Sequence, residues 1–357
     1  RYTRRVDLTQ AQLNYRWYGE AADKLYDDIS PTGPDALGLI IREPVGVVGA
    51  ITPWNFPMII NAWKLAPALM AGNSVVLKPA EQSPLTALRI AELAVEAGIP
   101  EGVLNVVPGY GETAGKALAL HNDVDAIAFT GSGAVGKLLL QYSGQSNMKR
   151  VSLETGGKTP NVIFADAPDM DFAVGAVGFS IFWNTGEMCL AGSRLLVEQA
   201  AYDQVVARLE DVAADWLPGD PLDPATKAGP VVDAEQLSRV TGYIDIGIDE
   251  GARLVTGGGR ALEETGGFFV EPTVFSGVDN SMRIAREEIF GPVLSVIPFA
   301  DEDEALRIAN DTSFGLAAAV WTSNLARAHT MARGLQAGTV WVNNFDQADI
   351  SAPFGGF

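Results

Sequence analysis

Cys189 is the only cysteine among the 357 residues, and it lies in a polar, glycine-bearing stretch that runs from Phe182 to Arg194. A lone cysteine is most often a small, inert apolar group in a protein core, which is the alternative role for Cys189. The apolar run from Phe172 to Phe182 predicts a buried helix before this stretch, and Arg194 to Glu198 predicts a strand after it. A thiol in a turn between two elements is open to ligands. We therefore predict that Cys189 acts as a nucleophile.

The partner of such a thiol has to come from elsewhere in the chain. The two histidines, His121 and His329, are far apart in sequence, which disfavours both a cysteine–histidine pair and a metal site. A single cysteine also excludes an intramolecular disulfide and a multi-cysteine zinc site. The sequence therefore favours a carboxylate as the base for Cys189 and predicts no metal.

The net charge is −19, which argues against nucleic acid and an anionic membrane surface as partners. Solubility is the ordinary explanation of such a charge, and attraction of a cationic substrate is a weaker one. No signal peptide is recognisable behind the first residues, Arg1 to Arg5, and the apolar stretches are too short to span a bilayer. We expect a cytoplasmic enzyme with a small-molecule substrate.

The elements around these residues alternate between strands and helices. A helix is expected at Thr9–Leu25 and a short strand at Leu37–Ile41. The strands that follow are expected at Val45–Ile51, Ser74–Leu77, Val103–Val107 and Asp125–Phe129, and the helices at Pro57–Ala71, between Ser83 and Gly98, at Glu112–Leu120 and at Ala134–Tyr142. Such alternation predicts a parallel sheet covered on both faces, with ligands at the carboxyl ends of its strands.

A second series of elements begins near Asn161. Its strands are expected at Asn161–Phe164, Arg194–Glu198, Arg253–Val255, Pro292–Phe299, Ala317–Trp321 and Thr339–Val342, and its helices at Tyr202–Trp216, Ala234–Glu250, Asp301–Asn310 and Leu325–Leu335. A chain of this length and 47% hydrophobic content can bury two cores. We therefore predict two α/β domains, with Cys189 near the start of the second.

Gly131 to Gly136 spells GxGxxG between an expected strand and an expected helix. Taken alone this is a weak dinucleotide signal, although glycine amides at a helix N-terminus can cradle a pyrophosphate. The rule for such folds would make Glu154 the ribose-binding acid, about 20 residues further on. We prefer another role for Glu154, because the turn from Thr155 to Lys158 is expected to bring its carboxylate into a cleft and not to a strand end.

Two further turns follow expected strands, where a parallel sheet binds ligands. The first, Thr52 to Pro57, contains Asn55, whose alternative role is that of a simple helix cap. The second contains Lys78 and Glu81, an ammonium and a carboxylate suited to ribose hydroxyls. Its alternative is a solvated charge pair, the usual state of a surface lysine and glutamate.

Seven motifs together resemble the signatures of the aldehyde dehydrogenase superfamily, in the family's order and over essentially the whole chain. They are Thr52–Pro57, Lys78–Glu81, Phe129–Ser132, Leu153–Lys158, Gly186–Arg194, Glu287–Val293 and Pro353–Gly356. The departures are Thr155, where the family usually has leucine, and Met188 beside the cysteine. Neither removes a catalytic group.

The resemblance implies an α/β fold of two Rossmann-like domains, one for the cofactor and one for catalysis, with part of a bridging oligomerisation hairpin. The expected boundaries are 1–44 for the N-terminal helix and bridging segment, 45–155 for the NAD(P)-binding domain and 156–357 for the catalytic domain. By comparison with the family the chain is expected to be truncated at both ends. The full-length protein is expected to be a homodimer or homotetramer.

The resemblance also implies a reaction, oxidation of an aldehyde to the acid. Cys189 would form a thiohemiacetal and then a thioester, the Asn55 amide and the Cys189 N–H would hold the oxyanion, and Glu154 would activate water. The cofactor would be bound by Trp54, Lys78, Glu81, Gly131, Ser132, Glu288 and Phe290. Glu81 favours NAD because it would repel a 2′-phosphate, and Lys78 leaves NADP open.

Phe56, Trp63, Trp183 and Phe345 match the aromatic residues that line the family's aldehyde tunnel. The segments Glu154–Gly157 and Val342–Asp349 resemble the branch that acts on 4-(γ-glutamylamino)butanal and 4-guanidinobutanal. Three carboxylates are candidates for binding a cationic tail, with an exposed acidic loop as the alternative explanation: Asp346, Asp349 and Glu187.

Other readings of the function stay open. They are a broad-specificity or betaine-type aldehyde dehydrogenase, a CoA-acylating aldehyde dehydrogenase and a non-enzymatic relative. Glu154 argues against the CoA-acylating enzyme, because it would hydrolyse the thioester, and the intact set of candidate residues argues against the non-enzymatic one.

Overall fold

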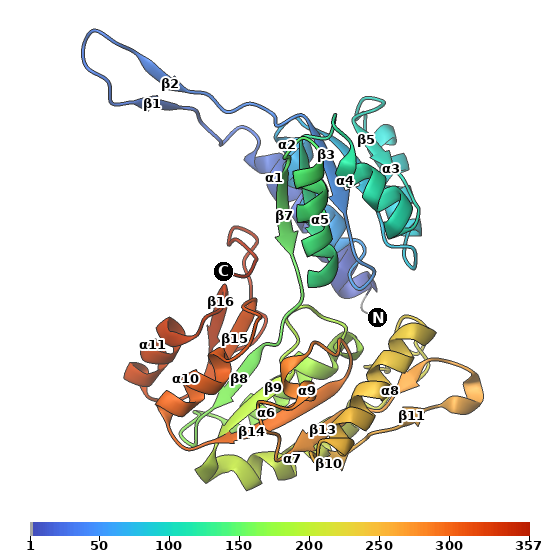
Figure 1. The fold of residues 1–357 in the computed structure, drawn as a ribbon, viewed down its shortest axis with the longest axis vertical. Helices are drawn as coiled ribbons and strands as arrows, with labels where there is room; N and C mark the ends of the chain where they lie inside the picture. Colours follow the sequence, from blue (N-terminus) through green and yellow to red (C-terminus); the bar gives the residue numbers. More distant parts are fainter. Residues whose placement is uncertain (1–2) are drawn as a thin grey trace. The chain divides into compact units, whose positions relative to one another are not determined.

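The computed structural model describes residues 3–357, so the first two residues of the expected segment 1–44 lie outside the described part. The chain divides into two compact units, an N-terminal unit that ends at Thr155 and a C-terminal unit that begins at Gly156 (Figure 1). Each unit has an α/β fold built on its own sheet. The predicted fold class is therefore confirmed.

The N-terminal unit contains a five-stranded parallel sheet with the order β5-β4-β3-β6-β7. Its strands are β3 (Val47–Ile51), β4 (Ser74–Lys78), β5 (Leu104–Val106), β6 (Ala126–Thr130) and β7 (Arg150–Glu154). Ala50 and Ile51 belong to two different core clusters, because successive side chains of a strand point to opposite faces. Both faces of this sheet are therefore covered, as the alternation predicted.

The helices of this unit are a short π-helical turn (Thr3–Asp7), α1 (Leu8–Ala21), α2 (Ile59–Met70), α3 (Leu85–Glu96), a second π-helical turn (Gly111–Gly115), α4 (Lys116–Leu120) and α5 (Gly133–Gln145). The expected helix start at Pro57 is wrong by two residues, because residues 54–58 form bends and turns. The first helix also ends earlier than Leu25.

A two-stranded antiparallel hairpin, β1 (Asp28–Ser30) and β2 (Gly38–Ile40), extends from the body of its unit (Figure 1). The sequence predicted its second strand and missed the first, whose three residues, Asp-Ile-Ser, carry no strand pattern. Its large apolar side chains are exposed to solvent: Tyr26, Ile29, Leu37, Leu39, Ile40 and Ile41. A two-stranded hairpin of this kind has little stability by itself.

The C-terminal unit contains a seven-stranded sheet with the order β10-β13-β14-β9-β8-β15-β16. Its strands are β8 (Pro160–Ile163), β9 (Arg194–Glu198), β10 (Arg253–Thr256), β13 (Thr273–Ser276), β14 (Val293–Phe299), β15 (Ala317–Trp321) and β16 (Thr339–Val342). This sheet is parallel except at one edge, where β10 pairs antiparallel with β13. The strand β13 was missed because it is a buried run of four residues, too short for a periodic signal.

The main helices of this unit are α6 (Met170–Phe182), α7 (Tyr202–Ala214), α8 (Ala234–Asp249), α9 (Arg283–Arg286), α10 (Glu302–Asn310) and α11 (Leu325–Gly334). Three short 3₁₀ turns (Trp183–Gly186, Gln199–Ala201 and Glu263–Thr265) and a small hairpin, β11 (Arg260–Ala261) with β12 (Phe269–Val270), complete it. Within residues 3–357, every helix is too short or too polar to cross a membrane.

Candidate functional site

The candidate residues of the N-terminal unit lie along the carboxyl edge of its sheet. The Thr52 N–H at the end of β3 donates to the Lys78 carbonyl at the end of β4, with an N–O distance of 3.1 Å. The Gly131 N–H after β6 donates to the Glu154 carbonyl at the end of β7, at 3.0 Å. Within this unit the turns that carry Asn55, Lys78, Gly131 and Glu154 therefore stand on four neighbouring strands.

Glu154 is the last residue of the edge strand β7. The expectation that Glu154 does not lie at a strand end is therefore wrong, because Arg150–Glu154 pairs with β6 and forms a strand that the sequence analysis missed. The side chain is half-buried. Burial raises the pKa of Glu154 to about 7, and the ammonium of Lys64 opposes that rise. A carboxyl group with this pKa can exchange a proton near neutrality, which suits a general base.

Lys64 is a residue of this site that the sequence analysis missed. Burial lowers the pKa of Lys64 to about 8, and the charge of Glu154 opposes this change. The sequence did contain a signal for Lys64, because it is the only charged residue in the apolar helix α2. Since long charged side chains are rarely buried without a partner, a lone lysine in such a helix indicates a nearby carboxylate.

Lys78 and Glu81 form an ion pair with an Nζ–Oε1 distance of 2.7 Å. Only 5% of the Lys78 side chain is exposed, so this is not the fully solvated pair of the alternative interpretation. Burial alone would raise the pKa of Glu81, but the hydrogen bond from Lys78 and the local backbone N–H groups outweigh it and leave the pKa below its ordinary value. The pair is thus a fixed donor and acceptor at the end of β4, as ribose hydroxyls require.

Ser132 is the N-cap of α5, and its Oγ accepts a hydrogen bond from the Val135 N–H at 3.3 Å. Gly131 and Ser132 therefore precede a helix N-terminus, where free backbone N–H groups and the helix dipole favour an anion. Ser132 and Gly133 are exposed. This local geometry fits a pyrophosphate.

Asn55 lies in the middle of the turn that joins β3 to α2, with Trp54 and Phe56 beside it, and all three are half-buried. The alternative role for Asn55 was that of a cap on the following helix. The first N–H groups of α2 are bonded by the carboxylate of Asp7. Trp63 is 36% exposed on α2.

In the C-terminal unit Cys189 and Glu288 lie at the opposite edge, the amino edge of the sheet, whereas the candidates Phe345, Asp346 and Asp349 follow β16. Gly156–Lys158 precedes β8, Gly186–Cys189 precedes β9 and Glu288–Gly291 precedes β14. These three strands are neighbours in the order β14-β9-β8, so the three segments form one junction. We name these three segments the cysteine junction.

Glycines allow the segments of the cysteine junction to approach one another. A Cβ on Gly156 would lie 2.1 Å from a Glu288 carboxylate oxygen, and one on Gly157 would lie 2.3 Å from the Cys189 carbonyl oxygen. A Cβ on Gly186, whose φ is +72°, would lie 2.2 Å from the Gly291 carbonyl oxygen. The backbone contacts at Gly157 and Gly186 therefore require glycine, and at Gly156 a side chain would displace the Glu288 carboxylate.

The turn before Cys189 is conformationally strained. Asn184 and Thr185 have φ values of 49° and 56°, so two residues that are not glycine adopt the left-handed conformation in succession before Gly186. Strain of this kind costs free energy and clusters at functional sites. Cys189 itself is partly exposed, whereas Met188 and Leu190 are buried. The interpretation of Cys189 as an inert core residue therefore loses its support.

The Glu288 carboxylate is fixed by the backbone of Gly156–Lys158, which we call the glycine segment, because its Oε1 accepts from the Gly157 N–H at 3.1 Å. Burial raises the pKa of Glu288, whereas this hydrogen bond and the charges of Lys158 and Arg239 lower it. Arg239 on α8 donates to the carbonyls of Glu288 and Ile289. The Glu288 carboxylate is thus held in one place.

Phe290 follows in the left-handed conformation, with φ at 61°. Its carbonyl accepts from the Gln236 amide at 2.5 Å. Gln236 and Arg239 are three residues apart on α8 and so project from one face of this helix. Neither residue was predicted from the sequence, although a glutamine and an arginine at this spacing lie on the predicted helix Ala234–Glu250.

Arg194, the first residue of β9, is hydrogen-bonded to the cysteine junction. Its Nε donates to the Lys158 carbonyl at 3.0 Å, and its two other nitrogens donate to the Ile308 and Ala309 carbonyls at the end of α10. The side chain is fully buried. Burial lowers the pKa of Arg194 to about 10. It remains charged at neutral pH and ties the glycine segment to the end of a helix, where a cation is favourable.

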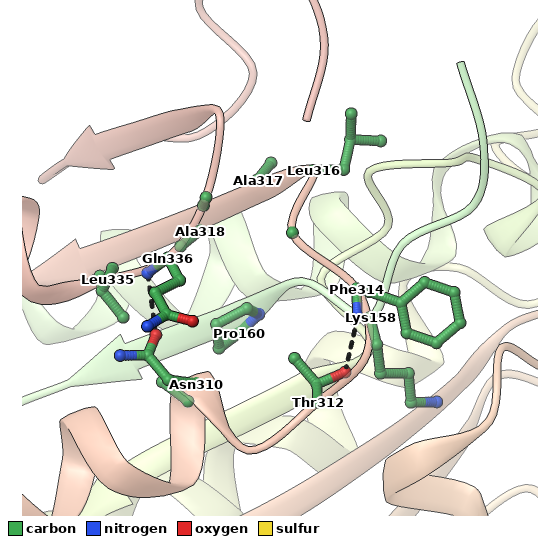
Figure 2. Close-up of a pocket in the computed structure, with 13 residues that line it drawn as sticks. Lys158, Pro160, Asn310, Thr312, Phe314, Leu316, Ala317, Ala318, Leu335 and Gln336 are labelled. Carbon is green, nitrogen blue, oxygen red and sulfur yellow. Dashed lines mark hydrogen bonds between the residues drawn. The ribbon is translucent and has the colours of Figure 1, made fainter. Parts of the chain in front are cut away.

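Lys158 is fully buried, and burial lowers its pKa to about 7. Figure 2 shows it beside a small cavity, which is lined by residues of β8 and β15 and of the segments before β8, β15 and β16. The volume of this cavity is about 10 Å³. On one wall of this cavity Asn310 accepts from the Gln336 N–H at 2.9 Å. A space of this size holds about one water molecule. It is too small for an aldehyde, so it is not the substrate site.

The expected substrate aromatics of this unit are both buried. Trp183 stacks on Phe179, with ring centroids 5.6 Å apart, and Phe345 packs on Trp341 at 4.9 Å. The loop around Phe345 is tied down, because the Trp341 indole N–H donates to the Gln347 carbonyl at 2.8 Å. These contacts anchor the segment Val342–Asp349, which resembles the branch with specific aminobutanal substrates.

The three candidate carboxylates differ in their surroundings. Asp349 is exposed and accepts from the Ser351 N–H and hydroxyl, so it fits the alternative of a local surface turn. Glu187 is buried and accepts from the Val232 N–H at 3.0 Å, and burial raises its pKa to about 8. Asp346 is half-buried, and burial raises its pKa to about 6. Asp346 therefore remains the best placed of the three to meet a cation.

Comparisons with known proteins agree over almost the whole chain. The family model described as aldehyde dehydrogenase family matches residues 2–357. The Escherichia coli (strain K12) protein called NADP/NAD-dependent aldehyde dehydrogenase PuuC is 51% identical over 100% of this chain and 71% of its own length.

Two solved structures have a TM-score of 0.98 with this chain. A γ-glutamyl-γ-aminobutyraldehyde dehydrogenase from Burkholderia cenocepacia is 58% identical, over 100% of this chain and 72% of that one. The indole-3-acetaldehyde dehydrogenase AldA from P. syringae, solved as a mutant in complex with NAD⁺ and IAA, is 59% identical over 99% of this chain and 71% of that one.

Proposed function

Since the chain belongs to the aldehyde dehydrogenase family and is therefore an enzyme that oxidises aldehydes, we propose that it works through a covalent intermediate on Cys189, with NAD⁺ as the hydride acceptor. The observation that carries this proposal is the cysteine junction. A partly exposed cysteine follows a strained turn and stands against glycines that admit its backbone, which is an arrangement for chemistry and not for packing.

In the first step the Cys189 thiol releases its proton to solvent, and its sulfur attacks the aldehyde carbon and forms a thiohemiacetal. The negative charge that develops on the oxygen is stabilised by the Asn55 side-chain amide and the Cys189 backbone N–H. A covalent step is needed because the carbonyl carbon releases hydride readily only when it is tetrahedral and bears an oxyanion. Bound NAD⁺ supplies the acceptor for that hydride, and a thioester on Cys189 remains.

In the second step Glu154 removes a proton from water, which adds to the thioester. The carbon–sulfur bond breaks, the carboxylic acid leaves and the thiol is restored. The pKa of about 7 that burial gives Glu154 supports this role, since about half of the groups are ionised at neutral pH.

The residues of the N-terminal unit fit NAD. Lys78 and Glu81 bind the hydroxyls of the adenosine ribose, the turn of Gly131 and Ser132 takes the pyrophosphate, and Trp54 forms a wall of the cleft. In the C-terminal unit Glu288 binds the nicotinamide ribose, with Phe290 beside it. The ionised Glu81 disfavours a 2′-phosphate, so NAD is preferred, while PuuC, named as NADP/NAD-dependent, shows that a relative accepts both.

We propose a 4-aminobutanal derivative as substrate, either γ-glutamylated or guanidinated. The name of the Burkholderia relative and the half-buried Asp346 in its anchored loop support this choice. The aromatic residues Phe56, Trp63, Trp183 and Phe345 favour the hydrocarbon part of the substrate. The P. syringae relative supports an alternative, an arylacetaldehyde.

The test is the rate of NADH formation with γ-glutamylamino-, guanidino-, aliphatic and indolyl aldehydes, for the intact chain and for Cys189→Ala. We expect the first two substrates to have the largest kcat/KM and Cys189→Ala to form no NADH. Activity that survives in Cys189→Ala overturns the mechanism, and a preference for the indolyl aldehyde overturns the substrate.

The product and the effect of added CoA on the rate distinguish this reaction from the CoA-acylating one. The carboxylic acid is expected as product without CoA, at an unchanged rate when CoA is added. A strict requirement for CoA would mean that Glu154 does not activate water.

We also propose that the exposed hairpin β1–β2 joins copies of this chain into a homodimer or homotetramer. Apolar strands in water are unfavourable, and a second copy would cover them. Light scattering of Ile29→Asp, which places a charge on the hairpin, should give a smaller mass than the unsubstituted chain.

A further inference from the structure

The helix α2 has no cap of its own. The residue before it, Met58, offers no side-chain acceptor, and Pro57 precedes that. The N–H groups of Met58 and Ile59 donate instead to the two carboxylate oxygens of Asp7, at 3.3 and 3.0 Å. A cap usually comes from the residue next to the helix, whereas this one comes from about fifty positions away in the sequence.

Asp7 is well suited to this task. It is 8% exposed, and it ends the π-helical turn that leads into α1, the helix that packs along α2. Burial raises the pKa of Asp7, and the two N–H groups oppose that change. A carboxylate at a helix N-terminus also meets the positive end of the helix dipole. The Asp7 carboxylate is therefore held in place by burial and by two backbone N–H groups, and its contact with α2 is not an incidental surface contact.

The position of this cap matters because of what precedes it. The turn from Thr52 to Met58 has two fixed ends: the Thr52 N–H bonds the Lys78 carbonyl at one end, and Asp7 bonds the Met58 N–H at the other. Asn55 lies midway, three residues from each end. With bends and turns between β3 and α2, the place of the Asn55 amide depends on both anchors.

We propose that Asp7 is a positioning residue for the oxyanion, holding the Asn55 amide in its place by capping α2. This inference rests on the proposed role of Asn55. An oxyanion donor acts mainly in the transition state, so its displacement lowers kcat and leaves cofactor binding unchanged. A displacement of about 1 Å is enough for a loss of about a hundredfold.

The experiment compares Asp7→Asn and Asp7→Ala with Asp301→Ala in the full chain. Asp301 is a matched control, because its Oδ1 caps α10 by accepting from the Glu304 N–H at 2.9 Å and lies in the other unit. We expect Asp7→Ala to lower kcat by about ten- to a hundredfold with an unchanged KM for NAD⁺. Asp7→Asn, which keeps one acceptor oxygen, should lose less, and Asp301→Ala should keep its full kcat.

A double substitution separates positioning from general weakening of the fold. If Asp7 acts through Asn55, Asp7→Asn lowers kcat in the unsubstituted chain but not further in Asn55→Ala. Equal losses in both backgrounds overturn the inference while leaving the role of Asn55 intact. A normal kcat in Asn55→Ala overturns the oxyanion role itself and the inference with it. If Asp7→Ala does not fold, the Asp7→Asn cycle still decides.

Discussion

The candidate residues of the N-terminal unit and the cysteine junction of the C-terminal unit lie at opposite edges of their sheets. In the N-terminal unit the candidate residues follow or end strands β3, β4, β6 and β7, whereas the cysteine junction of the C-terminal unit precedes strands β8, β9 and β14. In an α/β sheet helices begin at the carboxyl edge and end at the amino edge. The first edge therefore presents helix N-termini, and the second presents helix C-termini.

This difference separates two tasks. The N-terminus of α5 at the carboxyl edge favours an anion such as a pyrophosphate. Cys189 instead follows the C-terminus of α6, whose partial negative charge does not favour a thiolate. The amino edge therefore contributes close backbone packing, and activation of the thiol and of water has to come from a base.

The largest effect is expected for Glu154→Gln, which keeps the shape of the side chain and removes the base. Turnover should fall by about 10²- to 10⁴-fold, because the thioester is no longer hydrolysed. The unsubstituted chain should gain activity as pH rises through about 7, the pKa that burial gives Glu154, because only the ionised carboxylate accepts a proton. Steady-state rates across pH check both statements.

The first turnover distinguishes activation of water by Glu154 from deprotonation of Cys189 by the same residue. Glu154→Gln should still release NADH stoichiometrically with Cys189, since hydride transfer precedes hydrolysis. If this first release of NADH is absent, Glu154 is already needed to deprotonate Cys189. The carboxyl edge of the N-terminal unit would then supply the base for both steps.

Gly157→Ala is expected to disturb the cysteine junction. The new Cβ would lie 2.3 Å from the Cys189 carbonyl oxygen, a backbone atom that cannot turn aside. We expect a loss of kcat of about a hundredfold and a loss of stability of about 1–3 kcal/mol. The readouts are turnover and the midpoint of urea unfolding.

Gly175→Ala is the control for this substitution. Gly175 is exposed in α6 and has nothing within 4 Å of an added Cβ, so alanine should be neutral or slightly stabilising. Equal losses in the two variants would mean that the junction does not depend on close approach.

Much of this architecture could be predicted from the sequence because local signals agree with it. Alternation of apolar runs gave the strands β3, β4, β6, β8, β9 and β15 close to their bounds, and GxGxxG marked the start of α5. The short strand Thr273–Ser276 could not be found in this way, because its four buried residues do not alternate and its partners in the sheet make it a strand. Arg150–Glu154 does alternate polar and apolar residues, so its signal was present in the sequence and was missed.

The site shows the same limit. Cys189, Glu154 and Glu288 stood out through motifs, whereas Asp7 and Arg239 act through backbone groups about fifty residues away. No spacing rule reports such contacts. The rule that ligands bind at carboxyl edges also gives no guide to the cysteine junction, because the three segments of this junction precede their strands.

A smaller effect is expected for Lys78→Met, at the carboxyl edge. The substitution removes the buried charge that pairs with Glu81 and keeps most of the side-chain volume. The KM for NAD⁺ should rise by about tenfold, as expected for the loss of a hydrogen bond to a charged group, with kcat unchanged. A matching fall in kcat would show that this edge also takes part in the chemical step, which breaks the comparison between the units.

The smallest effect is expected for Lys64→Met. Below about pH 8 Lys64 is charged, and that charge lowers the pKa of Glu154. Its removal should raise the pKa of Glu154, so the rising limb of the pH–rate profile moves to higher pH and the plateau stays. Below neutrality this costs less than about tenfold in rate. Lys137→Met, on the exposed face of α5, is the control and should leave the profile in place. A limb that does not move in Lys64→Met, while Glu154→Gln abolishes turnover, would mean that Glu154 is the base but that burial alone sets its pKa.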